Sequence, residues 1–583
     1  MANQYQLDRM RPWTFTAALL LGASSQVQAV TFNVGEVQGQ FDSSLSIGSS
    51  WALRNADPAY VGTWNGGHAS SQSADDGRLN FRKGETFSKI FKGVHDLQLS
   101  YGDSGVFIRG KYWYDFELKD ESRRYLPISD SNRKEAAKSS GAQILDAFIY
   151  HNYFIDGQPG NARVGKQVVS WGESTFIGNG INVINPTDVA AFRRPGAEIK
   201  EGLIPVNMVF LSQGLTDSVS AELFYQLEWD QTVLDNCGTF FGSDVMADGC
   251  STRMGFSPPW DPTGQYHFTR GADRDARDSG QFGVALRWQA EALNNTEFGL
   301  YAMNYHSRAP FVGGRVGDSP FAVKPGSDAS SAEYFVEYPE DIRLYGLSFS
   351  TTLGTTAVSG ELSYRPNMPL SLNGSDVTIS AMAGSMAADL GSPIFASGFA
   401  RPVPGEDFHG YVRKPVSQAQ VTFTHFVDQV WAAERLTLIS EVGYNHLNDL
   451  NSSALRFGRD SIFGNGGLPD NRNCVTVGNP VNPQNCNNKG FYTRNSWGYR
   501  ARAILDYQNV FAGVNLKPSL SWSHDVEGYG PNFNEGSKAV SLGLDADLKN
   551  TYTASLSYTD FFGGDYNTAT DRDFVALSVG VSF

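Results

Sequence analysis

"DRDFVALSVGVSF" (571–583) ends the chain, and apolar residues occupy every second position of this stretch. These positions are Val575, Leu577, Val579, Val581 and Phe583. Alternation with a period of two places such side chains on one face of a β-strand. We interpret the segment as the closing strand of a transmembrane β-barrel, with its apolar face toward lipid and Phe583 in the aromatic girdle at the periplasmic rim. The same five residues would be the signal that the barrel assembly machinery recognises.

Four further segments repeat the alternation, at 104–118, 217–229, 497–507 and 539–548. In each of them apolar residues take one face and charged residues the other. Only a closed barrel pairs all its backbone groups in hydrocarbon, so the apolar faces would contact lipid and the charged faces would line a lumen. We therefore expect a set of charged side chains to face the lumen: Arg109, Lys111, Asp115, Glu117, Glu222, Glu228, Arg500 and Arg502.

The connections between these segments differ in length in a regular way. Short turns, such as 101–105 and 353–356, alternate with nine long polar segments. This asymmetry is typical of bacterial outer-membrane barrels, whereas a soluble β-sandwich has no reason to show it. One strand on each side of every connection predicts an all-β, antiparallel barrel of about 18 strands, with 16 as the alternative. Fewer than ten residues separate Ala29 from the first strand, which argues against the globular plug of a TonB-dependent transporter.

The N-terminal segment has the pattern of a secretory signal peptide. Arg9 and Arg11 precede a short apolar run, and Val27-Gln28-Ala29 ends it with a small-x-Ala site. We expect cleavage after Ala29 and a single barrel domain over 30–583, in the outer membrane of a Gram-negative bacterium. The net charge of −15 argues against nucleic acid as a partner. Charged residues are only 18% of the chain and aromatic residues 13%, which favours strands over helices.

The four cysteines fall into two local pairs, Cys237 with Cys250 and Cys474 with Cys486. Neither segment offers the histidines or the C-x-x-C spacing that a zinc site needs. Two disulfides within long loops are the better interpretation, and they indicate an oxidising compartment.

The connection 170–202 has the most unusual sequence of the long segments. Asn185 followed by Pro186 resembles the start of a short helix, which Pro195-Gly196 would end. Folded into the lumen, this loop would narrow it and place opposite charges across the path. We expect seven residues to form this constriction or gate: Asn185, Asp188, Arg193, Arg194, Glu198, Lys200 and Glu201. A solvated extracellular loop is the alternative. The segment 365–410 is a second candidate for folding inward.

Motifs for catalysis are absent from the sequence. There is no G-x-S-x-G elbow, no H-E-x-x-H and no Gly-rich phosphate loop, so we expect neither enzymatic activity nor a cofactor or bound metal. The acidic run at 273–278 lacks the spacing of a calcium loop. A barrel hydrolase with a Ser/His pair brought together only by the fold stays an alternative.

Several segments together resemble a known family. They include "GVFIRGKYWYDFEL" (105–118), "VSWGESTFIGNGINVINPTDV" (169–189) and "RRPGAEIKEGLIPVNM" (193–208). They look like the proteobacterial outer-membrane family catalogued as domain of unknown function 1302 (DUF1302). The resemblance implies an outer-membrane barrel, often encoded beside a periplasmic partner and an inner-membrane transporter of the resistance-nodulation-division (RND) type. Such neighbours suggest traffic of hydrophobic or amphipathic molecules.

These observations together predict a porin-like channel for small hydrophobic or amphipathic molecules. The alternative is a barrel that does not transport, either a surface-exposed binding protein that uses the disulfide-braced loops or an outer-membrane hydrolase.

Overall fold

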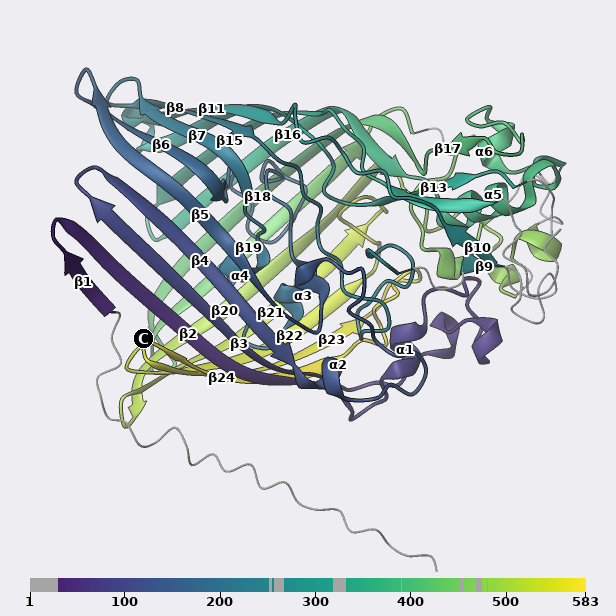
Figure 1. The fold of residues 1–583 in the computed structure, drawn as a ribbon, viewed down its shortest axis with the longest axis horizontal. Helices are drawn as coiled ribbons and strands as arrows, with labels where there is room; N and C mark the ends of the chain where they lie inside the picture. The colour runs from purple at the N-terminus through teal and green to yellow at the C-terminus, as the bar shows by residue number, and fades with distance from the viewer. Residues whose placement is uncertain are drawn as a thin grey trace, which may run out of the picture.

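Figure 1 shows the computed structural model of the chain as a ring of long, tilted strands with most of its irregular structure gathered at one end. The structure describes residues 30–250, 254–255, 267–317, 332–389, 391–450, 455–467, 474–479 and 481–583. The expected signal peptide, residues 1–29, lies outside this part of the chain.

Eighteen strands in the described residues close into one antiparallel barrel, as the sequence predicts. In chain order they are β2 (Val37–Ala52), β3 (Thr86–Tyr101), β4 (Ser104–Asp115), β5 (Ser140–Ile155), β6 (Gln158–Gln167), β7 (Val206–Gly214), β8 (Val219–Gln226), β11 (Phe282–Ala290), β12 (Thr296–Tyr305), β15 (Ile342–Leu353), β16 (Thr356–Ser371), β18 (Tyr411–Val430), β19 (Ala433–Leu447), β20 (Asn495–Phe511), β21 (Val514–Glu527), β22 (Lys538–Leu548), β23 (Tyr552–Phe562) and β24 (Phe574–Ser582). Each strand pairs with its neighbours in this order, and β24 returns to pair with β2. The short strand β1 (Val30–Val34) pairs antiparallel with the first five residues of β2.

The closing strand has one exposed and one covered face. Leu577 and Val579 on the outside are 43% and 48% exposed, whereas Ala576 and Ser578 on the inside are 8% and 6% exposed. Exposed apolar side chains recur at alternate positions on the other strands, among them Leu286, Leu347 and Leu542. The apolar alternation therefore marks the outer surface of the barrel, and material inside the ring covers the other face.

The two ends of the barrel differ as the connection lengths predict. At one end short turns join the strands in pairs; between β5 and β6 only Asp156 and Gly157 intervene, with φ of 51° and 80°. Positive φ at both positions is the type I′ geometry that suits a two-residue hairpin. The other end carries nine long connections. The C-terminus lies at the short-turn end, beside the first part of β2 (Figure 1).

A second, smaller sheet lies at the end of the long connections. It consists of β9 (Met254–Gly255), β10 (His267–Arg270), β13 (Phe311–Arg315), β14 (Glu333–Glu337) and β17 (Asp407–Phe408). The helices α5 (Gly374–Asp389) and α6 (Pro393–Ala396) pack against it through an apolar cluster. Figure 1 places these elements beyond the strand ends, so the expectation that the segment 365–410 folds into the lumen is wrong. Its small apolar residues build a core for this sheet instead.

Both expected disulfides are present, Cys237–Cys250 and Cys474–Cys486, and each closes a loop within one long connection. The remaining helices, α1 (Asp76–Asn80), α2 (Phe116–Asp120), α3 (Val189–Arg193) and α4 (Ile199–Gly202), are short. Across the described residues, no helix combines the length and the apolar character needed to cross a membrane.

Candidate functional site

The connection between β6 and β7, residues 168–205, lies inside the ring of strands, and we call it the inner loop (Figure 1). Asn185 ties its two ends together. The side-chain amide of Asn185 donates to the carbonyl oxygens of Gln167 and Ile204, at 3.3 and 3.0 Å, and its oxygen accepts from the backbone N–H of Val169 at 3.0 Å. Asn185 therefore holds together the two ends of the inner loop, which we call its neck. The expectation that Asn185 begins a helix is wrong.

Two buried carboxylates on the barrel wall hold the first half of the inner loop. Glu361 in β16 accepts the backbone N–H groups of Glu173 and Ile181, at 2.6 and 2.8 Å. Glu441 in β19 accepts three such groups, from Thr175 (3.0 Å), Phe176 (2.6 Å) and Ile177 (2.8 Å). A loop cannot form regular ladders, so these charged acceptors satisfy backbone donors that burial would otherwise leave unpaired.

Donors on the same wall complete this attachment. Arg365 donates to the carbonyl oxygen of Gly180 at 2.5 Å, and Gln418 donates to that of Gly178 at 2.9 Å. A Cβ atom at Gly180 would collide with the Glu361 carboxylate, so only glycine allows this approach. The β16, β18 and β19 strands thus bind the loop through both its N–H and its C=O groups.

The second half of the inner loop contacts the opposite part of the wall. Asp188 caps α3 by accepting the backbone N–H of Ala191 at 2.9 Å, and it also forms a buried ion pair with Lys111 of β4 at 3.0 Å. Lys92 of β3 pairs with Glu201 in α4 at 2.5 Å. The helix start predicted at Asn185 therefore lies three residues later, at Asp188. A carboxylate at this position both caps the helix and neutralises a wall lysine.

The other four expected gate residues have different surroundings. Arg193 pairs with Asp235, and its guanidinium lies 4.6 Å from the ring of Phe241. Arg194 follows the end of α3 and donates to the carbonyl oxygen of Ala136 at 2.8 Å. Glu198 and Lys200 pair with each other at 3.0 Å, and their side chains stay 45% and 31% exposed. Most of the charges expected to act on a passing solute are thus occupied in holding the loop.

Several of the expected lumen residues form ion pairs on the inner face of the wall. Arg109 contacts Asp96 through two hydrogen bonds of 2.7 Å and lies 3.4 Å from Asp146. Glu222 pairs with Arg287 at 3.1 Å and accepts from the indole N–H of Trp171, in the inner loop, at 2.6 Å. On the other side of the barrel, Arg500 pairs with Asp525 at 2.7 Å. Arg502 lies two residues further along the same face of β20.

Two expected strand ends are wrong, and both errors concern acidic residues. β4 ends at Asp115, whose side chain caps α2 by accepting the N–H groups of Glu117 (3.0 Å) and Leu118 (3.2 Å), so Glu117 belongs to a helix. β8 ends before Glu228, which accepts from the backbone and the side chain of Asn207 at 2.9 and 2.7 Å. Neither Glu117 nor Glu228 lies on a wall strand. At Asp115, helix capping ends the strand earlier than the side-chain pattern suggests.

One cavity lies among the long connections, and another lies near the short turns. The outer cavity, of about 470 Å³, has apolar walls of Met246, Met254, Phe311 and Ile379 and polar groups that include Arg459. Phe533 also lines this cavity. The side chains of Phe533 and of Ile177, in the inner loop, both lie next to Gly443 on the wall. The turn-side cavity, of about 510 Å³, is polar and includes Glu173.

Glu173 is the inner-loop residue that faces the turn-side cavity, together with Glu297 and Gln289. Burial raises the pKa of the Glu173 carboxyl to about 7, and the nearby carboxylates Glu297 and Glu361 act in the same direction against the opposing effect of Arg287. A group on the inner loop therefore changes charge near neutral pH.

Two pairs of serine and histidine lie on neighbouring strands, Ser43 with His95 and Ser104 with His151, each with 2.8 Å between the hydroxyl and Nδ1. A hydrolase would need such a contact, because the histidine must accept the proton of the serine that acts as nucleophile. The backbone N–H of Ser43, however, donates to the carbonyl oxygen of Phe583 at 2.6 Å, so it cannot act as an oxyanion donor. The ring of His95 stacks on Phe41 with 5.7 Å between centroids. These pairs are direct cross-strand contacts of the barrel wall.

Comparison with solved structures finds outer-membrane channels over nearly the full length. Acinetobacter baumannii OccAB1 matches with 10% identity and a TM-score of 0.41, covering 96% of this chain and 99% of that one. The outer membrane channel DcaP of the same organism matches with 9% identity and a TM-score of 0.35, covering 95% and 100%. Pseudomonas aeruginosa OccK2 (OpdF), in complex with glucuronate, matches with 9% identity and a TM-score of 0.37, covering 93% and 98%. These scores are low, so the description of the barrel rests on its own strand pairing.

No curated protein matches the chain. A family model does, over residues 10–583, and its description is "Protein of unknown function (DUF1302)". Because the match spans almost the entire sequence, the chain belongs to the DUF1302 family, as its sequence motifs suggest.

Proposed function

We propose that this protein is an outer-membrane channel for small hydrophobic or amphipathic molecules, and that the inner loop forms its constriction. The closed barrel with an apolar outer surface supports a place in a membrane, since every strand of the wall is paired with a neighbour on both sides. The asymmetric connections support an orientation with the long loops outside the cell.

One observation carries the proposal: the inner loop lies inside the barrel and is attached to opposite parts of its wall. Glu361 and Glu441 hold its first half, and Lys111 and Lys92 hold its second half. A barrel of 18 strands is wide enough for a water-filled channel unless something fills it. A loop anchored at mid-barrel by polar contacts is suited to limit the size of what passes.

The outer cavity supports the choice of substrate class. Apolar side chains such as Met254, Phe311 and Ile379 line part of it, and Arg459 and Asn534 provide polar contacts. A pocket with an apolar wall and a few placed polar groups suits a ligand that has both characters. Transport rather than catalysis is proposed because the Ser/His contacts are cross-strand contacts of the barrel wall, and the backbone N–H of Ser43 is already bonded to the carbonyl oxygen of Phe583.

The test compares the wild-type protein with a variant in which residues 172–182 are replaced by two glycines. This change removes the segment held by Glu361 and Glu441 but retains the Asn185 neck and the Lys111–Asp188 pair. Purified proteins are inserted in planar bilayers for single-channel recording, and into liposomes for uptake of a fluorescent fatty-acid analogue.

We expect small conductance steps and uptake of the analogue for the wild type, and clearly larger steps for the loop variant. A variant that folds, shown by heat-modifiable migration on gels, and conducts no better than the wild type would remove the loop from the role of constriction. If both proteins show no conductance and no uptake, the proposal of a channel is overturned. Binding of the analogue without flux would then favour a surface-exposed binding protein.

A further inference from the structure

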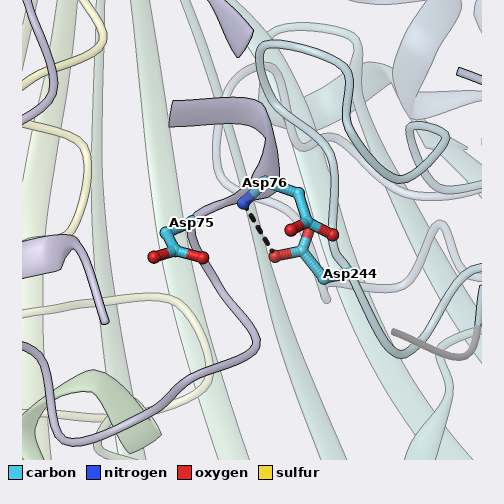
Figure 2. Close-up of side chains that lie close together, drawn as sticks. All are labelled: Asp75, Asp76 and Asp244. Atoms are coloured by element: carbon cyan, nitrogen blue, oxygen red, sulfur yellow. Dashed lines mark hydrogen bonds between the residues drawn. The ribbon is translucent and has the colours of Figure 1, made fainter. Parts of the chain in front are cut away.

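Three buried carboxylates meet where two long connections touch. Asp75 and Asp76 belong to the connection between β2 and β3, and Asp244 belongs to the connection between β8 and β11. Each offers one oxygen, and these three oxygens lie within 4.8 Å of one another. Figure 2 shows the carboxylates of Asp76 and Asp244 next to each other and that of Asp75 to one side of them, with the backbone N–H of Asp76 donating to Asp244 at 3.2 Å.

Two oxygens of this cluster have no donor. Oδ1 of Asp75 and Oδ1 of Asp244 are fully buried and lack a hydrogen-bond partner within the part of the chain that the structure describes. Asp75 and Asp244 are each only 1% exposed. Their second oxygens are occupied, since Asp75 accepts from Gly62 and Asn65 at 2.8 and 3.0 Å. A buried carboxylate oxygen without a donor costs free energy unless a cation or a proton satisfies it.

The two neighbouring arginines form their direct ion pairs with Asp571. Arg78 donates to the buried Asp571 at 3.1 Å, and Arg572 lies 3.4 Å from the other oxygen of the same residue. Both guanidinium groups are thus directed at Asp571 rather than at the three carboxylates.

The three carboxylate groups of the cluster are buried and lie within 4.8 Å of one another. The carboxylates therefore repel one another strongly when no counter-charge is present. A metal ion at their centre would remove this repulsion, and a shared proton is the competing explanation.

We propose that Asp75, Asp76 and Asp244 bind one calcium ion, which fastens the β2–β3 connection to the β8–β11 connection. The donor set consists of oxygens alone, which suits a hard cation and not zinc or copper. Calcium–oxygen distances of about 2.4 Å allow two ligands on opposite sides of one ion to lie up to about 4.8 Å apart, and the three oxygens all lie within that limit. Magnesium demands near-ideal octahedral geometry and usually keeps several waters, which suits a buried set of three carboxylates less well.

The surroundings are built for a close junction of the two connections. A Cβ atom at Gly77 would collide with the carbonyl oxygen of Thr239, so glycine permits the backbones to touch. Asn80 donates to the carbonyl oxygen of Gly238 at 2.8 Å, and the Cys237–Cys250 disulfide braces the segment that contains Asp244. Calcium would complete this junction at the mouth of the barrel.

The test uses the full chain in detergent, depleted of calcium with EGTA, and titrates it with calcium chloride in a calorimeter and in thermal unfolding. D244N removes one ligand charge at nearly constant volume. D156N is the matched control, because Asp156 is exposed in the two-residue turn at the far end of the barrel. D75N serves as a second variant if D244N does not fold.

We expect one calcium ion per wild-type or D156N chain and a rise in unfolding temperature with calcium. The D244N or D75N variant should lose affinity by at least about tenfold, since ligand charge sets the affinity of such sites. Equal isotherms for wild type and D244N would overturn the proposal. So would a wild-type protein that ignores calcium but gains stability as pH falls, because a shared proton would then hold the cluster.

Discussion

The carboxylate of Glu441, in β19, accepts the backbone N–H of Phe176 in the inner loop at 2.6 Å, although 265 positions separate the two residues in the chain. Glu441 is fully buried and binds Thr175 and Ile177 in the same way. One wall carboxylate therefore orders three consecutive residues of the loop. Because these contacts are polar and involve a single side chain, the position of the loop can be altered without disturbing the barrel.

Replacing Glu441 by alanine should release the first half of the inner loop. Each hydrogen bond to a charged acceptor contributes about 1.5–3 kcal/mol, and the variant loses three of them. We expect larger and noisier single-channel currents in planar bilayers. E434A is the control, since Glu434 is exposed near the start of the same strand. Identical currents for E441A and the wild type would show that the remaining wall contacts position the loop without Glu441.

The Lys111–Asp188 pair should matter far more for stability than a pair on the surface. The two side chains are 3% and 0% exposed, and removal of one partner leaves a buried charge. We expect K111M to lower the free energy of unfolding by about 3–5 kcal/mol. R435Q, which breaks the exposed Arg435–Asp428 pair, should cost less than about 1 kcal/mol. Guanidinium unfolding in detergent, followed by tryptophan fluorescence, compares the two variants; equal midpoints would contradict this assignment.

The barrel could be predicted because its signal is local and repeated. A period of two, read at segments such as 219–226 and 574–582, fixes which side chains face outward, and connection lengths fix the number of strands. The same reasoning fails at strand ends, where a single acidic residue such as Asp115 caps a helix and stops the strand. The pattern therefore predicts which face of each strand points outward, but it does not predict the residue at which a strand ends.

The inner loop was identified from its sequence, but its main anchors were not. Glu361, Arg365 and Glu441 lie on wall strands far from residues 170–202 in the chain, and only the closed fold brings them together. The available signal is weak: an isolated acidic residue at an inward position of a strand with small polar neighbours. The acidic cluster of Asp75, Asp76 and Asp244 combines two distant connections and has no spacing that the sequence reveals.

Glu173 predicts a dependence on pH near neutrality. Its pKa is raised to about 7 in the folded protein from an ordinary value of 4.5, so the folded state holds a proton that the unfolded state releases. The stability that this group contributes is present below about pH 4.5 and is lost as pH rises to about 7. The unfolding midpoint should therefore fall across this window in the wild type, and should fall less in E173Q.

The same titration should change ion selectivity. Above about pH 7 the carboxylate of Glu173 is charged beside the turn-side cavity and attracts cations. We expect the preference for potassium over chloride, from reversal potentials in a salt gradient, to rise with pH through this value. E173Q should show no such rise. A wild-type preference that does not change with pH would mean that ions do not pass close to Glu173.

Phe583 joins the two ends of the barrel sheet. Its backbone N–H donates to the carbonyl oxygen of Ser43 at 2.8 Å, and its carbonyl oxygen accepts the N–H of Ser43 at 2.6 Å. The residue therefore offers two things to assembly: a final backbone pair where β24 meets β2, and an aromatic ring at the short-turn end. Deletion of Phe583 removes both, whereas F583A removes only the ring.

We expect both Phe583 changes to lower the amount of protein in the outer membrane, measured by immunoblotting of membrane fractions. The reason is that the barrel assembly machinery would recognise the terminal aromatic ring before the strands close. W431A is the control, since Trp431 is an exposed aromatic side chain in a turn at the same end of the barrel. Normal amounts of F583A together with loss of the deletion variant would assign the effect to the Ser43 backbone pair. Normal amounts of both variants would remove Phe583 from any role in assembly.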